Sequence, residues 1–181
     1  MNMPHENNAP ELASVICQAV PNIPMVASGD DLAAVVAAPI ARVRWENGTC
    51  GMRGTDIVVI SSKLVAKAQG RWFRFGERPS GFVSRSGIPA GLDLDPVIEG
   101  DAEAAKIRRG LTARFGGRPG VIISSDGVGI GVAGMDHTTS DGLTIIAQLL
   151  ALHRRETGGK EMFPLSLIRG VVDVLTWEDC P

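Results

Sequence analysis

The chain has 181 residues, a formal charge of -2 and a hydrophobic content of 44%, which is enough to bury the core of one compact domain. A near-neutral chain lacks the basic surface that nucleic acid or an anionic membrane attracts, so neither is expected as a partner. No apolar run approaches the ~20 residues that a membrane-spanning helix needs.

The cysteines and the N-terminal residues indicate the compartment. Cys17, Cys50 and Cys180 are far apart and form no C-x-x-C pair, so they do not give the ligand spacing of a zinc site. Lone thiols are typical of a reducing compartment, and we expect a cytoplasmic protein. Residues 1–12 are polar, without a basic-then-apolar leader, and are predicted to form a flexible tail.

The first elements are an apolar strand over residues 13–20 and an alanine-rich helix over residues 32–38. Asp30 precedes this helix and is predicted to cap it, because a carboxylate accepts the free amide hydrogens of a first turn. Pro39 is predicted to end or kink the helix, since proline has no amide hydrogen to donate. For Asp30 and its neighbour Asp31 we favour capping over metal binding.

Residues 55–71 are the most informative stretch. Four β-branched residues, beginning at Ile57, predict a buried strand that runs into Ser61 and Ser62. Lys63 and Lys67 follow on one face of a short helix, which Gly70 is predicted to close. Free amide groups at a helix start, together with two ammonium groups, favour an anion such as phosphate. The alternative is a plain helix cap with solvated lysines, and the local residues leave both open.

A third helix is predicted over residues 102–115, with Asp101 as its N-cap and an acidic approach from Asp93 and Asp95. These carboxylates suit a helix start better than a cation site. The segment Gly120–Ser125 reads as another buried strand, and it ends at Asp126.

The glycine run that follows contains G-x-G-x-x-G at Gly129, Gly131 and Gly134. A dinucleotide site requires a helix to open at the third glycine, but a polar loop over residues 135–142 is expected there instead. The alternation of small and apolar residues favours a strand against which another backbone packs closely. His137 and its polar neighbours lack the strained turn that a hydrolytic nucleophile needs.

An apolar helix over residues 143–153 and a strand over residues 164–169 complete the predicted elements. Strands and helices mix without a strict alternation, which indicates a mixed α/β (α+β) fold. We expect a single domain over residues 13–175 and a tail over residues 176–181.

Several segments occur in one order along the chain, namely N-I-P-M-V, G-D-D-L-A, the strand and helix of residues 56–71, G-V-I-I, the glycine run and L-I-R-G. This order resembles that of the glutamate ligase family of coenzyme F(420). The resemblance covers residues 13–170, and its most specific part is S-K-L-V-A-K-A-Q-G-R, beginning at Ser62.

This resemblance implies a shortened fold of two intertwined lobes, a homodimer, and GTP with Mg or Mn. It also implies glutamate and a small carboxylate acceptor as substrates. The acceptor carboxylate would be activated by the γ-phosphate and then attacked by the amino group of glutamate. By resemblance, Ser61, Ser62, Lys63 and Lys67 would hold the phosphates, and Pro24 would lie beside the base.

The acids of the family pattern are altered in this sequence. Its metal-facing acidic stretch is matched by residues 84–89, where Pro89 stands at the acid's position, and Asp126 is the surviving acid. Two hypotheses follow. One is a γ-glutamyl ligase, and the other is a catalytically silent relative that serves as a binding or dimer-partner scaffold.

Overall fold

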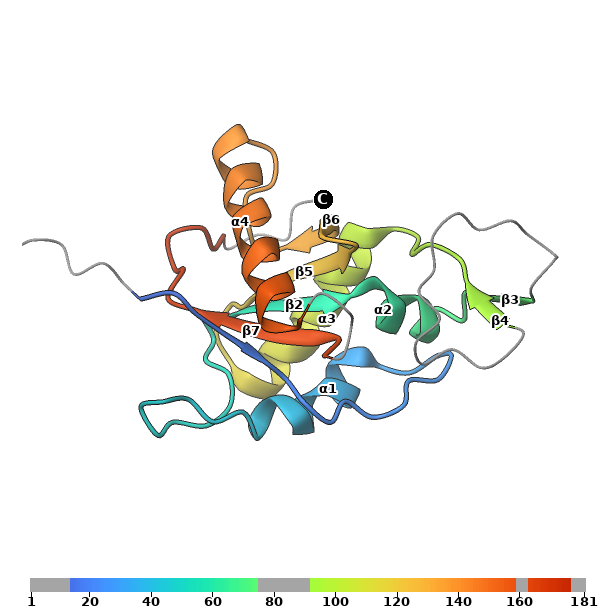
Figure 1. The fold of residues 1–181 in the computed structure, drawn as a ribbon, viewed down its shortest axis with the longest axis horizontal. Helices are drawn as coiled ribbons and strands as arrows, with labels where there is room; N and C mark the ends of the chain where they lie inside the picture. Colours follow the sequence, from blue (N-terminus) through green and yellow to red (C-terminus); the bar gives the residue numbers. More distant parts are fainter. Residues whose placement is uncertain (1–13, 75–91, 159–162, 177–181) are drawn as a thin grey trace, which may run out of the picture.

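Five strands form one mixed sheet in the order β1-β7-β2-β5-β6 (Figure 1). The computed structural model describes residues 14–74, 92–158 and 163–176. The strands are β1 (Ile16–Ala19), β2 (Ile57–Ser61), β5 (Gly120–Ser125), β6 (Val128–Ala133) and β7 (Leu165–Arg169). Strands β2 and β5 run parallel and the other pairs are antiparallel. The mixed α/β class is therefore confirmed, while the two lobes remain a prediction.

Helices cover both faces of this sheet (Figure 1). They are α1 (Leu32–Ala41), α2 (Ser62–Ala68), α3 (Gly100–Phe115) and α4 (Ser140–Glu156). Side chains alternate along a strand. Val58 and Ile60 of β2 therefore pack with α1 and α3, whereas Ile57 and Val59 pack with α4. Two buried layers result, one on each side of the sheet.

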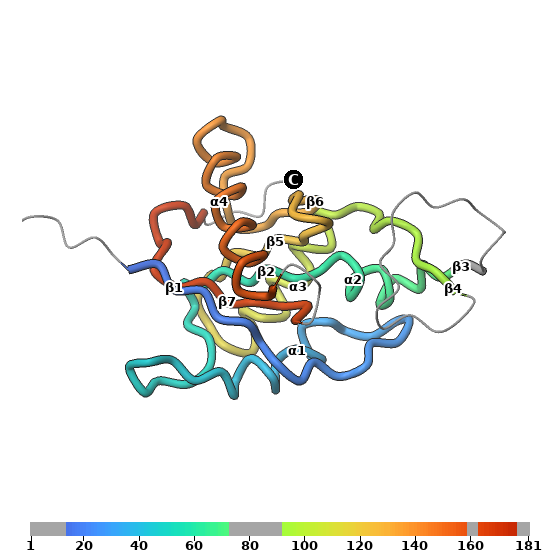
Figure 2. Tube along the Cα trace, viewed as in Figure 1, coloured from blue at the N-terminus to red at the C-terminus, as the bar shows by residue number. Residues whose placement is uncertain are grey.

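A small second sheet pairs β3 (Trp72–Arg74) with β4 (Leu92–Leu94). In the chain trace these strands lie beyond α2, away from the five-stranded sheet (Figure 2). Arg71, which follows α2, donates its amide hydrogen to the Ala66 carbonyl (2.9 Å), while Gly70 donates to Lys67 (3.0 Å). Gly70 has a φ of +68°, so this pair of bonds ends the helix at the predicted glycine.

The first predicted helix is confirmed, but its cap and its end are corrected. The carboxylate of Asp31, not that of Asp30, accepts the amide hydrogens of the first turn, while Asp30 accepts from Ala27 in the preceding turn (2.8 Å). Pro39 lies inside α1, which continues to Ala41. A proline in the last turn removes one hydrogen bond, and Pro39 and Ile40 are both buried.

The starts of the two later helices also differ from prediction. Glu99 is the N-cap of α3, with a φ of +51° and no side-chain capping bond. Asp101 instead accepts the amide hydrogen of Val132 in β6 (2.8 Å), so a bond between elements replaces the expected local cap. Helix α4 starts at Ser140, inside the predicted loop, because Thr139 accepts the Gly142 amide hydrogen.

The glycine run forms strand β6, as predicted. A Cβ atom on Gly131 would lie 2.3 Å from the Gly100 carbonyl oxygen, so two backbones meet there without side chains. No helix opens at Gly134, which leads into a loop. In that loop the Asp136 carboxylate accepts hydrogen bonds from Thr138 and Thr139, and these bonds lower the pKa of Asp136 to about 2. Asp136 therefore orders the turn before α4.

Three sequence predictions lie outside the described part of the chain, namely the tail over residues 1–12, residues 177–181 of the second tail, and the 84–89 stretch with Pro89. Thr176, the first residue of the second tail, donates its amide hydrogen to the Gly134 carbonyl (2.9 Å). Within the ranges that are described, no helix is long and apolar enough to cross a membrane.

Candidate functional site

Ser61 and Ser62 stand where the central strand β2 becomes helix α2. Ser61 is 8% exposed. Its amide donates a hydrogen bond to the Pro164 carbonyl (2.8 Å), and its Oγ accepts one from the Lys63 amide (3.3 Å). Ser61 is thus the N-cap of α2, while Ser62 is its first residue and is half-buried. The capping role is confirmed, and phosphate binding by these serines remains a prediction.

Lys63 and Lys67 lie one turn apart on α2, and both side chains are largely shielded from water. Lys67 is 8% exposed and Lys63 is half-buried. Like charges four residues apart on a helix repel each other, and burial removes the water that would stabilise them. Two ammonium groups with little access to water therefore lie at the end of the central strand, where a nearby negative charge would stabilise them.

The structure places two carboxylates near these lysines. The Asp126 and Asp93 carboxylates both act on the Lys63 ammonium, as does the Lys67 ammonium. Asp126 comes from the turn after β5, and Asp93 comes from β4, where it is 6% exposed. Asp93 was predicted as part of the acidic approach to α3. It lies instead in β4, which pairs with β3, and no local sequence pattern signals that pairing.

Asp126 occupies a tight hairpin turn. Ser125 pairs with Val128, which leaves Asp126 and Gly127 as a two-residue loop between β5 and β6. Their φ values are +49° and +83°, the conformation of a type I′ turn, for which Asp-Gly is a preferred sequence. The side chain is exposed, so this residue has a sufficient structural role without a ligand.

Burial lowers the pKa of Lys63 to about 8, and the neighbouring Lys67 ammonium contributes to the decrease. The Asp126 and Asp93 carboxylates act in the opposite direction and favour the charged form. Burial also lowers the pKa of Lys67. Burial therefore disfavours the charged form of both lysines, whereas a bound anion would favour it.

A divalent cation at this site would compete with the lysines. Mg and Mn prefer several oxygen ligands, and the Asp126 and Asp93 carboxylates already interact with the positive charge of Lys63. Among the residues that the structure describes, no three His, Cys, Asp or Glu side chains gather where they could hold a metal ion. Metal binding by Asp126 stays a prediction.

Pro24 lies in the exposed loop between β1 and α1. The end of this loop is attached to the C-terminal end of α2, because Gly29 donates its amide hydrogen to the Ala68 carbonyl (2.8 Å). Met25, next to Pro24, is 83% exposed. The structure thus brings this loop to α2, and a contact between Pro24 and a nucleotide base stays a prediction.

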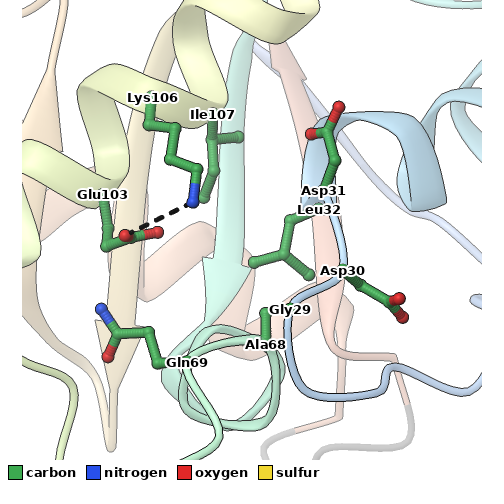
Figure 3. Close-up of a pocket in the computed structure, with 9 residues that line it drawn as sticks. All are labelled: Gly29, Asp30, Asp31, Leu32, Ala68, Gln69, Glu103, Lys106 and Ile107. Carbon is green, nitrogen blue, oxygen red and sulfur yellow. Dashed lines mark ion pairs between the residues drawn. The ribbon is translucent and has the colours of Figure 1, made fainter.

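A cavity of about 110 Å³ lies on another side of α2, between the starts of α1 and α3 (Figure 3). It is lined by Gly29, Asp30, Asp31, Leu32, Ala68, Gln69, Glu103, Lys106 and Ile107. None of the predicted site residues lines it. Its polar side chains already have partners: Lys106 pairs with Glu103 (3.7 Å), and Gln69 bonds to the Ile98 backbone.

Comparisons with known proteins point to one family. The family model described as F420-0:Gamma-glutamyl ligase matches residues 21–82. The Coenzyme F420:L-glutamate ligase of Archaeoglobus fulgidus is 28% identical over 152 residues, covering 58% of this chain and 57% of that protein. The protein of the same name from Halorubrum lacusprofundi is 34% identical over 95 residues, covering 47% of this chain and 34% of that protein.

The chain thus spans 57% and 34% of the lengths of these two curated relatives. The segment matched by the family model includes Pro24 and the α2 lysines. Asp93 and Asp126 lie outside it.

Proposed function

We propose that this chain binds GTP and forms a γ-glutamyl amide bond on a small carboxylate acceptor, because it is similar to members of the F420-0:gamma-glutamyl ligase family. The observation that supports the proposal is the pair of shielded lysines, Lys63 and Lys67, at the end of the central strand and inside the segment that the family model matches.

The proposed chemistry requires positive charge around the phosphates. The acceptor carboxylate attacks the γ-phosphorus of GTP, so that an acyl phosphate forms and GDP leaves. The glutamate amine then attacks the acyl carbon, and phosphate departs as the amide bond forms. Negative charge develops on the phosphate oxygens in the first step, and fixed ammonium groups stabilise it. Ser62 and the two lysines are the residues proposed for this role, with Pro24 beside the base.

The substrates and the assembly are proposed as well. Glutamate and a small carboxylic acid are the proposed substrates, and a homodimer in the cytoplasm is the proposed assembly. A divalent ion, Mg or Mn, would supply further charge neutralisation when bound with GTP, and Asp126 is the proposed acid nearest to it. Size-exclusion chromatography with light scattering tests the dimer, and a monomeric mass at micromolar concentration would contradict it.

A second candidate is a silent relative that binds nucleotide without turning it over. The tight Asp126–Gly127 turn favours this candidate, because it leaves one exposed acid between β5 and β6. Such a protein would act as a binding or dimer-partner scaffold.

Thermal unfolding with GTP or ATP, each with and without Mg or Mn, tests nucleotide binding. A ligand that binds only the native state raises the unfolding midpoint. A rise together with glutamate-dependent phosphate release supports the ligase, and a rise without phosphate release supports the silent binder. An unchanged midpoint in every combination would remove both candidates.

The double variant Lys63→Ala, Lys67→Ala tests the site itself. It should abolish the nucleotide-induced rise in midpoint. Lys106→Ala is the matched control, since Lys106 is an exposed α3 lysine in a weak pair with Glu103. Equal nucleotide affinity of the double variant and the wild type would place the site elsewhere.

A further inference from the structure

We infer that Arg154, in the last turn of α4, holds a carboxylate of the glutamate substrate beside the turn that joins β5 to β6. The inference rests on the proposed function, because it names a binding residue for one of the proposed substrates. In the sequence, Arg154 is only one of two arginines at the C-terminal end of a helix, where positive charge suits the helix dipole.

The Arg154 side chain lies over the Asp126–Gly127 turn. Its Nη1 atom is 3.6 Å from the position that a Cβ atom on Gly127 would occupy. The turn follows β5, in which Ser124 pairs with Ser61 at the end of β2. Adjacent strands lie about 4.8 Å apart, so the turn and the start of α2 are neighbours at the carboxyl end of these two strands. Arg154 therefore lies beside the proposed phosphate site.

Helices α2 and α4 lie on opposite faces of the sheet. Leu64 and Val65 of α2 pack in the layer of α1 and α3, whereas Leu149 and Leu150 of α4 pack in the layer on the other face. In open sheets, ligands bind at the carboxyl ends of the parallel strands. A ligand bound there would thus meet α2 on one side and the Arg154 guanidinium on the other.

The Arg154 guanidinium is available to a ligand. Its side chain is exposed. In the part of the chain that the structure describes, no carboxylate pairs with it and no oxygen accepts a hydrogen bond from it. Its N–H donors are therefore not used by neighbouring residues.

Glutamate needs such a partner in the proposed reaction. Both of its carboxylates stay ionised while its amine attacks the acyl phosphate, so a doubly negative group must approach another negative group. A fixed guanidinium offsets this repulsion. Its planar fork can donate two parallel hydrogen bonds to a carboxylate, whereas a lysine ammonium acts on phosphate as a point charge. The arginine therefore suits the carboxylate, and the lysines suit the phosphates.

Arg154→Gln tests the inference, and Arg155→Gln is its matched control. Both arginines are exposed in the last turn of α4. Successive helical residues point about 100° apart, and the charge of Arg155 acts on Cys17 in the edge strand β1. Both variants should unfold at the wild-type midpoint without ligand, because neither side chain is buried. Arg154→Lys keeps the charge but not the fork, so its glutamate affinity should be intermediate.

Calorimetric titrations of the full chain measure two affinities, one for GTP with Mg and one for L-glutamate after saturation with a non-hydrolysable GTP analogue. The wild type should bind both. Arg154→Gln should bind glutamate at least about tenfold more weakly, because charged hydrogen bonds are lost, and should bind GTP within about twofold of the wild type. Arg155→Gln should bind both ligands like the wild type.

Wild-type glutamate affinity in Arg154→Gln would overturn the inference. An equal loss of glutamate and GTP affinity would also overturn it, because Arg154 would then belong to the phosphate site. Wild-type protein that binds GTP but not glutamate would overturn the inference and leave nucleotide binding standing. Absence of GTP binding by the wild type would overturn the proposed function together with the inference.

Discussion

Arg169 and Asp56 form a buried ion pair between residues 113 positions apart in the chain. Asp56 is fully buried and accepts from Arg169 Nε (2.8 Å) and Nη2 (2.7 Å), as well as from the Arg53 amide (2.6 Å). The guanidinium also lies 3.7 Å from the centre of the Trp45 ring. The pair joins the end of β7 to the start of β2, at the opposite end of β2 from Ser61.

Asp56→Asn should lower the free energy of unfolding by about 3–5 kcal/mol, because it leaves the Arg169 guanidinium buried without its counter-charge. Urea unfolding measures the change. Lys106→Met is the control, since it removes an exposed partner of Glu103 and should cost less than about 0.5 kcal/mol. A loss below about 1 kcal/mol for Asp56→Asn would show that the pair is not needed for stability.

His153 makes stability depend on pH. Its Nδ1 lies 2.8 Å from Ser166 Oγ, and burial lowers the pKa of His153 to about 4 from 6.5. As the pH falls below 6.5, the unfolded chain takes up the proton before the native chain does. The stabilisation is therefore complete above about pH 6.5 and is lost as the pH falls toward 4, by up to about 3 kcal/mol.

Urea unfolding at pH 7.5 and at pH 5.0 should show this loss as a difference of about 2 kcal/mol. The variant His153→Asn keeps a polar atom near Ser166 but does not titrate, so its two values should lie closer together. An equal pH dependence in variant and wild type would assign the acid sensitivity to other groups.

Among the helices and strands, β6 and the start of α3 meet at Gly131 and Gly100, where neither glycine has room for a side chain. A Cβ on Gly131 would stand 2.3 Å from the Gly100 oxygen, whereas a Cβ on Gly129 would meet Ile146 at an ordinary 3.5 Å. Gly129 and Gly131 belong to the same strand and to the same G-x-G-x-x-G motif, but only Gly131 lacks the space for a side chain.

Gly131→Ala should destabilise the protein by at least about 2 kcal/mol, since either backbone must move. Gly129→Ala should be neutral or stabilising by up to about 1 kcal/mol, because alanine loses less chain entropy on folding. Midpoints of thermal unfolding compare the two variants. Equal effects would mean that α3 can shift away from β6 without cost.

The sheet order organises the molecule from its centre outward. Strands β7 and β2 are paired on both sides and covered by helices on both faces, and β5 is paired with β2 and β6. All five residues of β2 are buried, whereas the first three of β6 are not. Stability should therefore be highest along β2 and β5 and lower toward the edges.

Native-state hydrogen exchange should report this gradient. Amides of Ile57–Ser61 and of residues 121–123 should exchange only through global unfolding, while those of the β3–β4 pair should exchange through local opening. Faster exchange in β2 than in β1 would contradict the order of protection that the sheet implies.

The sequence by itself determined the elements whose signals lie within a few residues. The strand Gly120–Ser125 was predicted with its observed bounds, and the turn from β2 through Ser61 into α2 was predicted together with its closing glycine. Buried β-branched runs, serine caps and glycine stops act locally, so they can be read without the rest of the chain. The caps at Asp30 and Asp101 were wrong, because a shift of one or two residues in the start of a helix changes which amide a carboxylate reaches.

Only the tertiary structure decided which charges surround Lys63. The charges of Asp93 and Asp126 act on Lys63 because β4 pairs with β3, and because β5 lies parallel to β2 with a two-residue turn at its end. The residues around Lys63 contain no sequence pattern that predicts either strand pairing. Coulomb interactions depend on distance in space, and strand order sets that distance between residues that are far apart in sequence.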